Sequence, residues 1–410
     1  MNYKIVIIDT CFNWPPTGGA WVDLYETAVQ LSSLGNEVTF IMPEYERRGL
    51  TAFNHIPSFK VEKIPFTSIN FFPKNICKQI LKKVESIHPD MVMLGDGYFL
   101  KSPLLNALSN YKTVLRFFGH ELLCITTTGA RMRDGANCEK DFLNNPDICY
   151  DCWLDQYGKD YSERKLEDYD VEFIRAFGFL PNYHPGLIGN LTRCKAIICY
   201  NEMTSKIIKS VNPNCFVIPG GVNTDLFEYK ERAPVLNRKK RIFMPGNTHA
   251  ARKGYTVFMK AVELLNSKRD DFEVYVTNLQ KGKAENIISL GLFPYYSMYK
   301  LYQQMDICVV PSIWNEPFGM VSLEAMATGI PAIVSDVGGL KTTVRDGYNG
   351  FVFENGNAEQ LSQRIEYLLD NEEERIQMGK NGRKWVEEKF SWKKIVHENY
   401  EKVFSSLGMQ

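Results

Sequence analysis

The chain has 410 residues, more than one hydrophobic core usually supports, so two domains are expected. Its 48 basic residues balance 48 acidic ones, which argues against a nucleic-acid-binding protein, because such proteins need a basic excess or a basic face. Hydrophobic residues make up 44% of the chain and charged residues 23%, as in soluble globular proteins. No stretch approaches the roughly 18 apolar residues of a membrane span, and no signal-peptide pattern precedes the first strand, so a cytoplasmic protein is expected.

The first half of the chain predicts alternating strands and helices, as in a parallel sheet. Short apolar runs predict strands at residues 4–8, 37–42, 61–64, 91–94, 113–117, 196–200 and 216–218. The first helix follows the pair Gly18-Gly19 and ends at Gly35. Its predicted apolar face is Val22, Tyr25, Val29 and Leu31. The glycine pair either lets a ligand approach the backbone or forms a structural turn, and its spacing does not fit the Gly-x-Gly-x-x-Gly of a dehydrogenase.

A second helix, near residues 76–87, overlaps an amphipathic stretch from Phe66 to Lys83 in which apolar residues are mixed with lysines. Such a stretch either packs its apolar face on the protein or lies on a bilayer, where it would give weak peripheral membrane contact.

His120 follows the predicted strand at residues 113–117. A lone histidine is more often structural than catalytic. The position of His120 favours a functional role, because open parallel sheets bind ligands beyond the carboxyl ends of their strands.

The segment 122–184 is irregular and holds Cys124, Cys138, Cys149 and Cys152. The last two form a Cys-x2-Cys pair, which can supply half of a tetrahedral zinc site, and the two distant cysteines can supply the other half. Four reduced thiols are the alternative. If zinc is bound, four sulfur ligands leave no open position, so the metal would be structural.

The same segment contains Asp168-Tyr169-Asp170, which has the spacing of a metal-binding Asp-x-Asp motif. It lies in a run of charged residues and does not follow a strand, so a solvated helix face is the preferred interpretation.

The second half of the chain begins after a polar and basic linker at residues 219–240. A strand at 241–244, a glycine-bearing loop at 245–254 and a helix near Tyr255 repeat the pattern of the first domain. Arg252 and Lys253 stand at the start of this helix and suit a diphosphate, because a fixed cation stabilises the charge of a departing phosphate. Apolar segments at 272–276 and 290–293 flank a variable stretch, and a helix is predicted at 295–305.

The densest pattern runs from residue 307 to residue 350. It predicts a strand at 307–310, a helix at 320–328 capped by Gly329, and a strand at 331–334. The first-turn amides of Phe318, Gly319 and Met320 suit an anion. Phosphate would repel carboxylates, so Glu316 and Glu324 are predicted to accept hydrogen bonds from sugar and ribose hydroxyls. The alternative is a solvated Glu316 and a Glu324 placed favourably near a helix N-terminus.

The segment from Asn315 to Phe353, with Glu-x7-Glu followed by Gly338-Gly339, resembles the donor-site signature of retaining GT-B glycosyltransferases of family 4 (glycosyl transferases group 1). The loop and helix at residues 15–40, the linker segment 219–227 and the four-cysteine insertion are also similar to this family. The resemblance touches nearly the whole chain.

The resemblance implies an α/β GT-B fold with two Rossmann-like domains facing a central cleft. Residues 1–218 would form the acceptor domain, 219–240 the linker, 241–391 the donor domain, and 392–410 a helix that crosses back. It implies a retaining glycosyltransferase that moves a sugar from a nucleotide sugar to an acceptor hydroxyl, in the synthesis of cell-surface polysaccharide, glycolipid or secondary-metabolite glycosides. The acceptor would be a saccharide, a lipid-linked molecule or a small molecule, reached in the cytoplasm or at the inner face of the membrane.

The resemblance also implies the roles of individual residues. Glu316, His120 and Lys253 would be catalytic, and a UDP- or GDP-sugar would be bound without a catalytic cofactor. The donor-binding set would be Gly18, Gly19, Asn247, Arg252, Lys253, Gly291, Glu316, Pro317, Phe318, Gly319, Met320 and Glu324. This chain has Asn247 where the family usually has arginine, and Arg252 is a candidate to replace that guanidinium.

Two other classes fit the same architecture. One is a sugar-nucleotide epimerase or a phosphorylase, and a phosphorylase would carry pyridoxal phosphate on a lysine. The other is a non-catalytic subunit that binds a carbohydrate or nucleotide sugar, which the presence of both glutamates and Lys253 disfavours.

Overall fold

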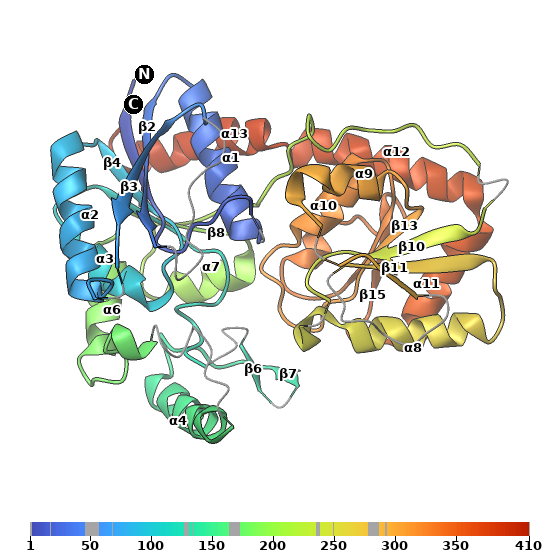
Figure 1. Cartoon of the computed structure of the whole chain (residues 1–410), viewed down its shortest axis with the longest axis horizontal. Helices are drawn as coiled ribbons and strands as arrows, with labels where there is room; N and C mark the ends of the chain where they lie inside the picture. Colours follow the sequence, from blue (N-terminus) through green and yellow to red (C-terminus); the bar gives the residue numbers. More distant parts are fainter. Residues whose placement is uncertain are drawn as a thin grey trace. The chain divides into compact units, whose positions relative to one another are not determined.

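The computed structural model describes residues 2–16, 18–45, 57–67, 69–126, 131–133, 135–163, 173–234, 238–248, 250–277, 287–291 and 293–409. The chain divides into two compact units (Figure 1). Unit 1 comprises Met1–Pro219 and Val396–Gln410, and unit 2 comprises Gly220–Ile395. The Asp168-Tyr169-Asp170 motif lies outside the described residues.

The described part of unit 1 contains one large sheet with the strand order β3-β2-β1-β4-β5-β8-β9. Its strands are Lys4–Ile8 (β1), Glu37–Glu44 (β2), Lys60–Pro65 (β3), Met91–Leu94 (β4), Thr113–Arg116 (β5), Ala196–Cys199 (β8) and Cys215–Val217 (β9). All of these pairings are parallel. This is the strand order of a doubly wound sheet, in which the chain reverses its winding direction between β1 and β4.

Helices cover both faces of this sheet, and α1 and α2 lie on opposite sides of strands β1 to β4 (Figure 1). The helices of unit 1 are Gly19–Ser33 (α1), Pro73–Ile87 (α2), Lys101–Ala107 (α3), Pro146–Ser162 (α4), Tyr183–Arg193 (α6) and Glu202–Ile208 (α7), with Trp392–Ser406 (α13) running from unit 2 into unit 1. A 3-10 turn, Tyr98–Leu100, precedes α3, and a short antiparallel hairpin, Met132–Arg133 (β6) with Ala136–Asn137 (β7), precedes α4.

Helix α2 packs its apolar stripe into the core of unit 1. Ile76, Ile80 and Val84 are buried there with Val6 and Ile8 of β1. The interpretation of the Phe66–Lys83 stretch as a packed amphipathic helix is therefore confirmed.

The predicted apolar face of α1 was wrong in part. Val22 and Leu31 are buried as predicted, but Tyr25 and Val29 are only half-buried. The carboxylate of Asp23 is buried instead, because Arg116 of β5 donates two hydrogen bonds to it, at 3.1 and 2.7 Å. A bidentate charged partner allows a carboxylate to be buried on a face that apolar periodicity cannot identify.

Unit 2 has a second parallel sheet, with the order β12-β11-β10-β13-β14-β15 in the described part of the chain. Its strands are Lys240–Met244 (β10), Phe272–Val276 (β11), Ile287–Ser289 (β12), Ile307–Val310 (β13), Ala332–Ser335 (β14) and Gly350–Phe353 (β15). Its helices are Tyr255–Asn266 (α8), Met298–Tyr302 (α9), Met320–Ala327 (α10), Ala358–Asp370 (α11) and Glu372–Lys389 (α12). The prediction of two Rossmann-like α/β domains is confirmed.

In unit 2, α8 and α11 lie against one face of the sheet and α10 and α12 against the other (Figure 1). Gly329 has a φ of +89°, which suits the predicted cap at the end of α10. The predicted helix at 295–305 is shorter, since it consists of a 3-10 turn, Tyr295–Ser297, followed by α9. No helix among the described residues combines the length and the apolar character that crossing a bilayer requires.

Candidate functional site

The strongest candidate site lies in unit 2 at the carboxyl ends of β10 and β13. These strands are neighbours, and the sheet winds away from them in opposite directions, which places the ligand crevice of a doubly wound sheet at this point. Lys253 belongs to a 3-10 turn, Ala251–Lys253, in the loop after β10. Glu316 lies in the loop after β13, just before α10.

Glu316 is the centre of a dense set of hydrogen bonds. The Lys253 Nζ donates to both carboxylate oxygens at 2.9 Å, and the Ser312 hydroxyl and the Trp314 indole N–H donate at 2.9 and 2.7 Å. The side chain of Glu316 is only 12% exposed. Burial acts to raise its pKa, but Lys253, Ser312 and Trp314 together hold the pKa below its usual range. Glu316 is therefore an ionised carboxylate with a fixed orientation.

Two glycine-bearing loops hold the backbone around Glu316. A Cβ on Gly254 would lie 1.8 Å from the Pro311 carbonyl oxygen, and a Cβ on Gly338 would lie 2.3 Å from that of Glu316. The Gly339 amide donates to the same Glu316 carbonyl at 2.8 Å. Gly254 and Gly338 also have positive φ, so a side chain at either position would be strained and would displace the Glu316 loop.

The site carries more positive than negative charge. Arg252 and Lys253 both lie beside the ring of Trp314, at 5.4 and 5.3 Å from its centroid. Arg252 forms no ion pair with any described carboxylate, and its buried Nε has no acceptor among the described residues. Two cations thus accompany the single carboxylate of Glu316. One positive charge is left over, which an anionic ligand could neutralise.

Glu324 has a different environment on α10. Its carboxyl group accepts a hydrogen bond from the Tyr302 hydroxyl at 2.9 Å, and no other side chain in the described part of the chain is recorded as its partner. Burial raises the pKa of Glu324 to about 7, although the hydrogen bond from Tyr302 opposes this. Glu324 therefore has room for a second donor, as the predicted ribose contact requires.

Gly319 is the N-cap of α10 for a reason that the sequence did not suggest. It has a φ of +109°, and a Cβ there would lie 2.4 Å from the Leu340 side chain. This left-handed backbone therefore favours glycine whether or not a phosphate approaches, and Leu340 leaves little room for a Cβ. Pro317, Phe318 and Met320 flank it, between the Glu316 loop and the first turn of the helix, and their contact with a donor stays a prediction.

The other predicted donor-binding residues are not in recorded contact with Glu316. Asn247 is exposed in the loop after β10, and Gly291 is exposed with a φ of +64°. In unit 1, Gly18 is extended and exposed, and nothing lies within 4 Å of a Cβ built on it, so packing alone does not demand glycine there. Gly19 is the first residue of α1.

His120 is buried, with 1% of its surface exposed. Its carbonyl accepts hydrogen bonds from the amides of Leu123 and Cys124, which fold the following segment into a turn. The predicted contact between His120 and the donor sugar stays a prediction.

A buried charged cluster next to His120 was missed by sequence reasoning. Lys101 of α3 donates to Glu121 and lies 3.9 Å from Asp96, and all three lie near the carboxyl edge of the sheet. Glu121 accepts from the amides of residues 118 and 119, so it holds the loop before His120. Asp9 accepts from the Asp96 amide at 2.8 Å. The available signal was that Asp9 and Asp96 each follow a predicted strand by at most two residues.

Burial raises the pKa of Asp9, and the neighbouring Asp96 raises it further. The pKa of Asp96 is also raised, again mainly by burial. Burial opposes ionisation of Glu121 too, but Lys101 outweighs it and holds the pKa of Glu121 below its usual value. The cluster is thus satisfied within unit 1 and offers little to a ligand.

The four cysteines of the insertion are near enough to interact. Burial raises the pKa of the Cys149 thiol to about 12, and Cys124, Cys138 and Cys152 raise it further. Among the described residues, however, no set of three or more His, Cys, Asp or Glu side chains is arranged to hold a metal ion. Structural zinc stays a prediction from the cysteine spacing, which elemental analysis of the purified protein can test.

Comparisons with known proteins bear on unit 2 most directly. Residues 227–385 match the family model described as "Glycosyl transferases group 1". Two relatives are uncharacterized glycosyltransferases of Methanocaldococcus jannaschii. MJ1607 is 35% identical over 250 residues, which cover 56% of this chain and 62% of the relative. MJ1178 is 30% identical over 230 residues, which cover 53% and 61%. The capsular polysaccharide biosynthesis glycosyltransferase CapM of Staphylococcus aureus is 39% identical over 106 residues, which cover 26% of this chain and 27% of CapM.

Solved structures extend the likeness of the fold to the whole chain. Sucrose-phosphate synthase from Thermosynechococcus elongatus has a TM-score of 0.71 at 16% identity and covers 99% of this chain and 100% of its own. Anabaena HepE, solved in complex with UDP-glucose, has a TM-score of 0.66 at 13% identity and covers 98% and 100%. The predicted GT-B fold is confirmed. The chain spans about three fifths of the length of the two M. jannaschii relatives. The stretch that matches the glycosyl transferases group 1 model contains Lys253, Glu316 and Glu324.

Proposed function

We propose that the protein is a retaining glycosyltransferase whose unit 2 binds a nucleotide sugar, with UDP- or GDP-sugars as the donor class. The observation that carries the proposal is the site at the ends of β10 and β13. There Glu316 is fixed by Lys253, Ser312 and Trp314 while Arg252 has no acidic partner. A nucleotide sugar has hydroxyls for the carboxylate and a diphosphate for the cations.

In this proposal the residues divide the donor between them. Arg252, Lys253 and the first-turn amides of α10 hold the diphosphate, because fixed donors at a helix N-terminus stabilise negative charge as it develops. Glu316 accepts hydrogen bonds from the transferred sugar, and Glu324 accepts them from the ribose. Lys253 is shared between Glu316 and the diphosphate, so it links the sugar end of the site to its phosphate end.

For the chemical step we infer attack of the acceptor hydroxyl on the face from which the diphosphate departs. The bond from the anomeric carbon to the phosphate oxygen breaks, the bond to the acceptor oxygen forms, and the leaving phosphate oxygen takes the acceptor's proton. Glu316 then stabilises an oxocarbenium-like ring and does not act as a nucleophile, in contrast to carboxylates in retaining glycosidases. No catalytic metal is part of this mechanism.

The acceptor side is assigned to unit 1. Gly18, Gly19 and His120 lie near the carboxyl edge of its sheet, where a doubly wound sheet binds ligands. The similarity to CapM supports a saccharide acceptor. Although α2 packs its apolar stripe into the core of unit 1, Ile69 and Phe72 just before it are 89% and 47% exposed. These two side chains beside the lysines of α2 support a lipid-linked acceptor reached from the cytoplasm at the inner face of the membrane.

The test is a thermal-shift panel of UDP-, GDP-, ADP- and TDP-sugars, followed by transfer assays with the stabilising donor. A bound donor raises the melting temperature by mass action, and a saturating donor at about 100 times its Kd adds about 2.7 kcal/mol to the free energy of unfolding. Stabilisation by one base class together with transfer to an acceptor supports the proposal. If no nucleotide sugar stabilises the protein, the assignment fails. Stabilisation without transfer or donor hydrolysis across an acceptor panel would indicate a binding subunit instead.

A further inference from the structure

Trp314 lies in the loop after β13 and contacts both parts of the proposed donor site. Its indole N–H donates to Oε2 of Glu316 at 2.7 Å. The centroid of its ring lies 5.4 Å from the guanidinium carbon of Arg252 and 5.3 Å from the Nζ of Lys253. The proposed function assigns the carboxylate to the sugar and the two cations to the diphosphate, so one side chain joins the groups that serve both.

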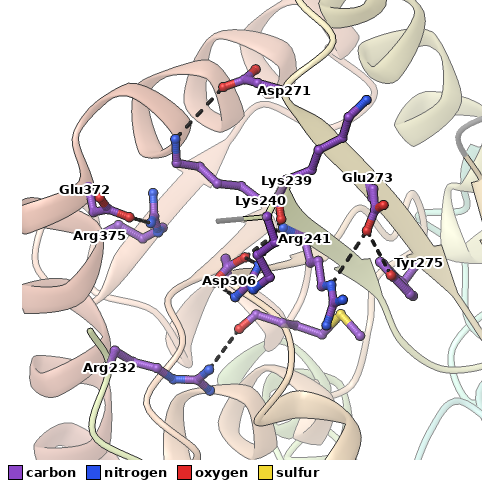
Figure 2. A network of polar contacts seen from close by, with 12 residues as sticks. Arg232, Lys239, Lys240, Arg241, Asp271, Glu273, Tyr275, Asp306, Glu372 and Arg375 are labelled. Carbon is purple, nitrogen blue, oxygen red and sulfur yellow. Dashed lines mark hydrogen bonds and ion pairs between the residues drawn. The ribbon is translucent and has the colours of Figure 1, made fainter. Parts of the chain in front are cut away.

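The contact between Arg252 and an aromatic ring stands out because other basic side chains of unit 2 pair with carboxylates. Figure 2 shows such a network, which contains the ion pairs Lys240–Asp271, Arg241–Glu273 and Arg375–Glu372. Arg252 has no carboxylate partner in the part of the chain that the structure describes, and the contact recorded for its guanidinium is with Trp314. Like charges repel, and the negative face of an aromatic ring attracts a cation. The ring of Trp314 thus offsets the repulsion between Arg252 and Lys253.

The indole N–H also decides which oxygen of Glu316 remains open to a ligand. Oε2 accepts from Lys253, from the Ser312 hydroxyl and from Trp314, at 2.9, 2.9 and 2.7 Å. Oε1 accepts from Lys253 at 2.9 Å and from no other described side chain. Each carboxylate oxygen can accept about two hydrogen bonds, so Oε2 is saturated and Oε1 keeps room for a further donor. A sugar hydroxyl is such a donor.

The course of the loop does not depend on the indole. The Ile313 amide donates to the Arg252 carbonyl at 2.9 Å, and the Asn355 side chain donates to the Ile313 carbonyl at 3.2 Å. Trp385 of α12 shows a structural use of tryptophan in the same unit, since its N–H donates to the Thr343 backbone carbonyl at 3.0 Å. Packing alone accounts neither for an indole N–H directed at a buried carboxylate nor for two cations against one ring.

We propose that Trp314 is a positioning residue that couples the sugar end of the donor site to its phosphate end. Its N–H saturates one oxygen of Glu316 and leaves the other for the transferred sugar, while its ring holds Arg252 beside Lys253 for the diphosphate. Charges and dipoles that are fixed in advance need no reorganisation when charge develops in the transition state. The inference rests on the proposed function, because it names the side chain that joins the two halves of that site.

Two substitutions of Trp314 separate its N–H from its ring. Trp314→Phe keeps an aromatic ring but loses the N–H, so kcat should fall about tenfold, because a hydrogen bond to a charged group is lost. This variant should bind a nucleoside diphosphate about as tightly as the wild type does. Trp314→Leu also removes the ring, so it should weaken nucleoside diphosphate binding about fivefold or more, because two cation–π contacts are lost.

The measurements are isothermal titration calorimetry with UDP and GDP, which reports the phosphate end, and kcat of transfer at saturating donor, which reports the sugar end. Trp385→Phe is the matched control, since it removes one indole hydrogen bond in the same unit. The melting temperature of each variant shows that it is folded. A purely structural Trp314 would lower the melting temperature without separating kcat from nucleoside diphosphate binding.

Support requires a lower kcat in Trp314→Phe than in Trp385→Phe, together with weaker nucleoside diphosphate binding in Trp314→Leu than in Trp314→Phe. Equal kcat in the two phenylalanine variants overturns the inference, and so does equal nucleoside diphosphate affinity in the two Trp314 variants. These outcomes leave the proposed function intact, because the wild type still binds and transfers. If the wild type binds no nucleotide sugar in the thermal-shift panel, the proposed function fails and this inference fails with it.

Discussion

The two sheets have the same strand order around their switch points but use the carboxyl edge there in opposite ways. In unit 1, Asp9 and Lys101 are fully buried and Glu121 is 5% exposed, and these groups satisfy one another and the neighbouring backbone. In unit 2, the Lys253 side chain is 29% exposed beside Glu316, and Arg252 has no acidic partner in the described part of the chain. The charged groups of the unit 1 edge hold their own loops in place, whereas those of the unit 2 edge stay partly exposed.

The balance of charge differs in the same way. Unit 1 sets three carboxyl groups against the single ammonium of Lys101. Burial raises the pKa of Asp9 and Asp96, and a neighbouring carboxylate raises each further. Unit 2 sets Arg252 and Lys253 against the single carboxylate of Glu316, so positive charge remains uncompensated. The surplus at the unit 2 edge is positive, as the proposed binding of a diphosphate requires.

The largest expected effect comes from breaking the buried charged cluster of unit 1, which is formed by Asp9, Asp96, Lys101 and Glu121. Lys101→Met leaves Glu121 buried without its cation, and removal of one partner of a buried ion pair costs about 3–5 kcal/mol of unfolding free energy. Hydrogen exchange of the β4 and β5 amides measures the loss within unit 1, where a whole-chain melt would mix both units. Lys112→Met, a surface lysine of the same unit, is the control. Equal protection in the two variants would mean that the cluster does not stabilise unit 1.

The second-largest effect is expected from neutralising Glu316, the carboxylate of the candidate site in unit 2. Glu316→Gln keeps the shape of the side chain but removes the charge that Lys253 contacts, so transfer should fall about 10²–10³-fold, as for the loss of other electrostatic stabilisers. The fold should survive, because the Ser312 and Trp314 donors retain an acceptor. Steady-state rates with a fixed donor measure the change. Complete loss of activity, together with a trapped covalent adduct in the wild type, would instead make Glu316 a nucleophile.

The fold was predictable because its signal is local. Buried parallel strands such as β1 and β13 are short apolar runs. Glycines mark the ends of the helices that follow them, as Gly19 does for α1 and Gly329 for α10. Glu316 and Lys253 were predicted as site residues for the same reason, since each follows a strand that the sequence identifies.

Contacts between distant residues were not predictable. The ion pair of Lys253 and Glu316 spans 63 residues and exists because β10 and β13 are neighbours, which apolar runs do not specify. The buried pair of Asp23 and Arg116 spans 93 residues, and it placed a carboxylate on a face of α1 where periodicity demands apolar residues. Whether a polar side chain can be buried depends on its partner, and the sequence does not reveal partners that lie so far apart in the chain.

A smaller effect tests how the Glu316 loop is held. Gly338→Ala forces a Cβ into the Glu316 carbonyl oxygen, whereas Gly356→Ala, at a φ of +79°, meets no atom within 4 Å. Both variants should lose about 1 kcal/mol or more of stability, because alanine is strained at positive φ. Only Gly338→Ala should also lower kcat/KM, as the carboxylate moves away from Lys253. Equal kcat/KM in the two variants would show that the position of the loop does not matter for activity.

The smallest effect concerns Glu324, whose burial raises its pKa to about 7. Because the folded-state pKa lies above the ordinary glutamate value of 4.5, ionisation opposes folding, and stability should fall as the pH rises from about 4.5 through about 7. Donor binding should respond in the opposite direction, since only the ionised group accepts a hydrogen bond from each of two ribose hydroxyls. Donor affinity is therefore expected to rise by up to about tenfold between about pH 6 and about pH 8. Glu324→Gln should flatten both profiles while it keeps an oxygen for Tyr302. A donor titration at several pH values checks this, and a pH slope that persists in Glu324→Gln would assign the titration to another group.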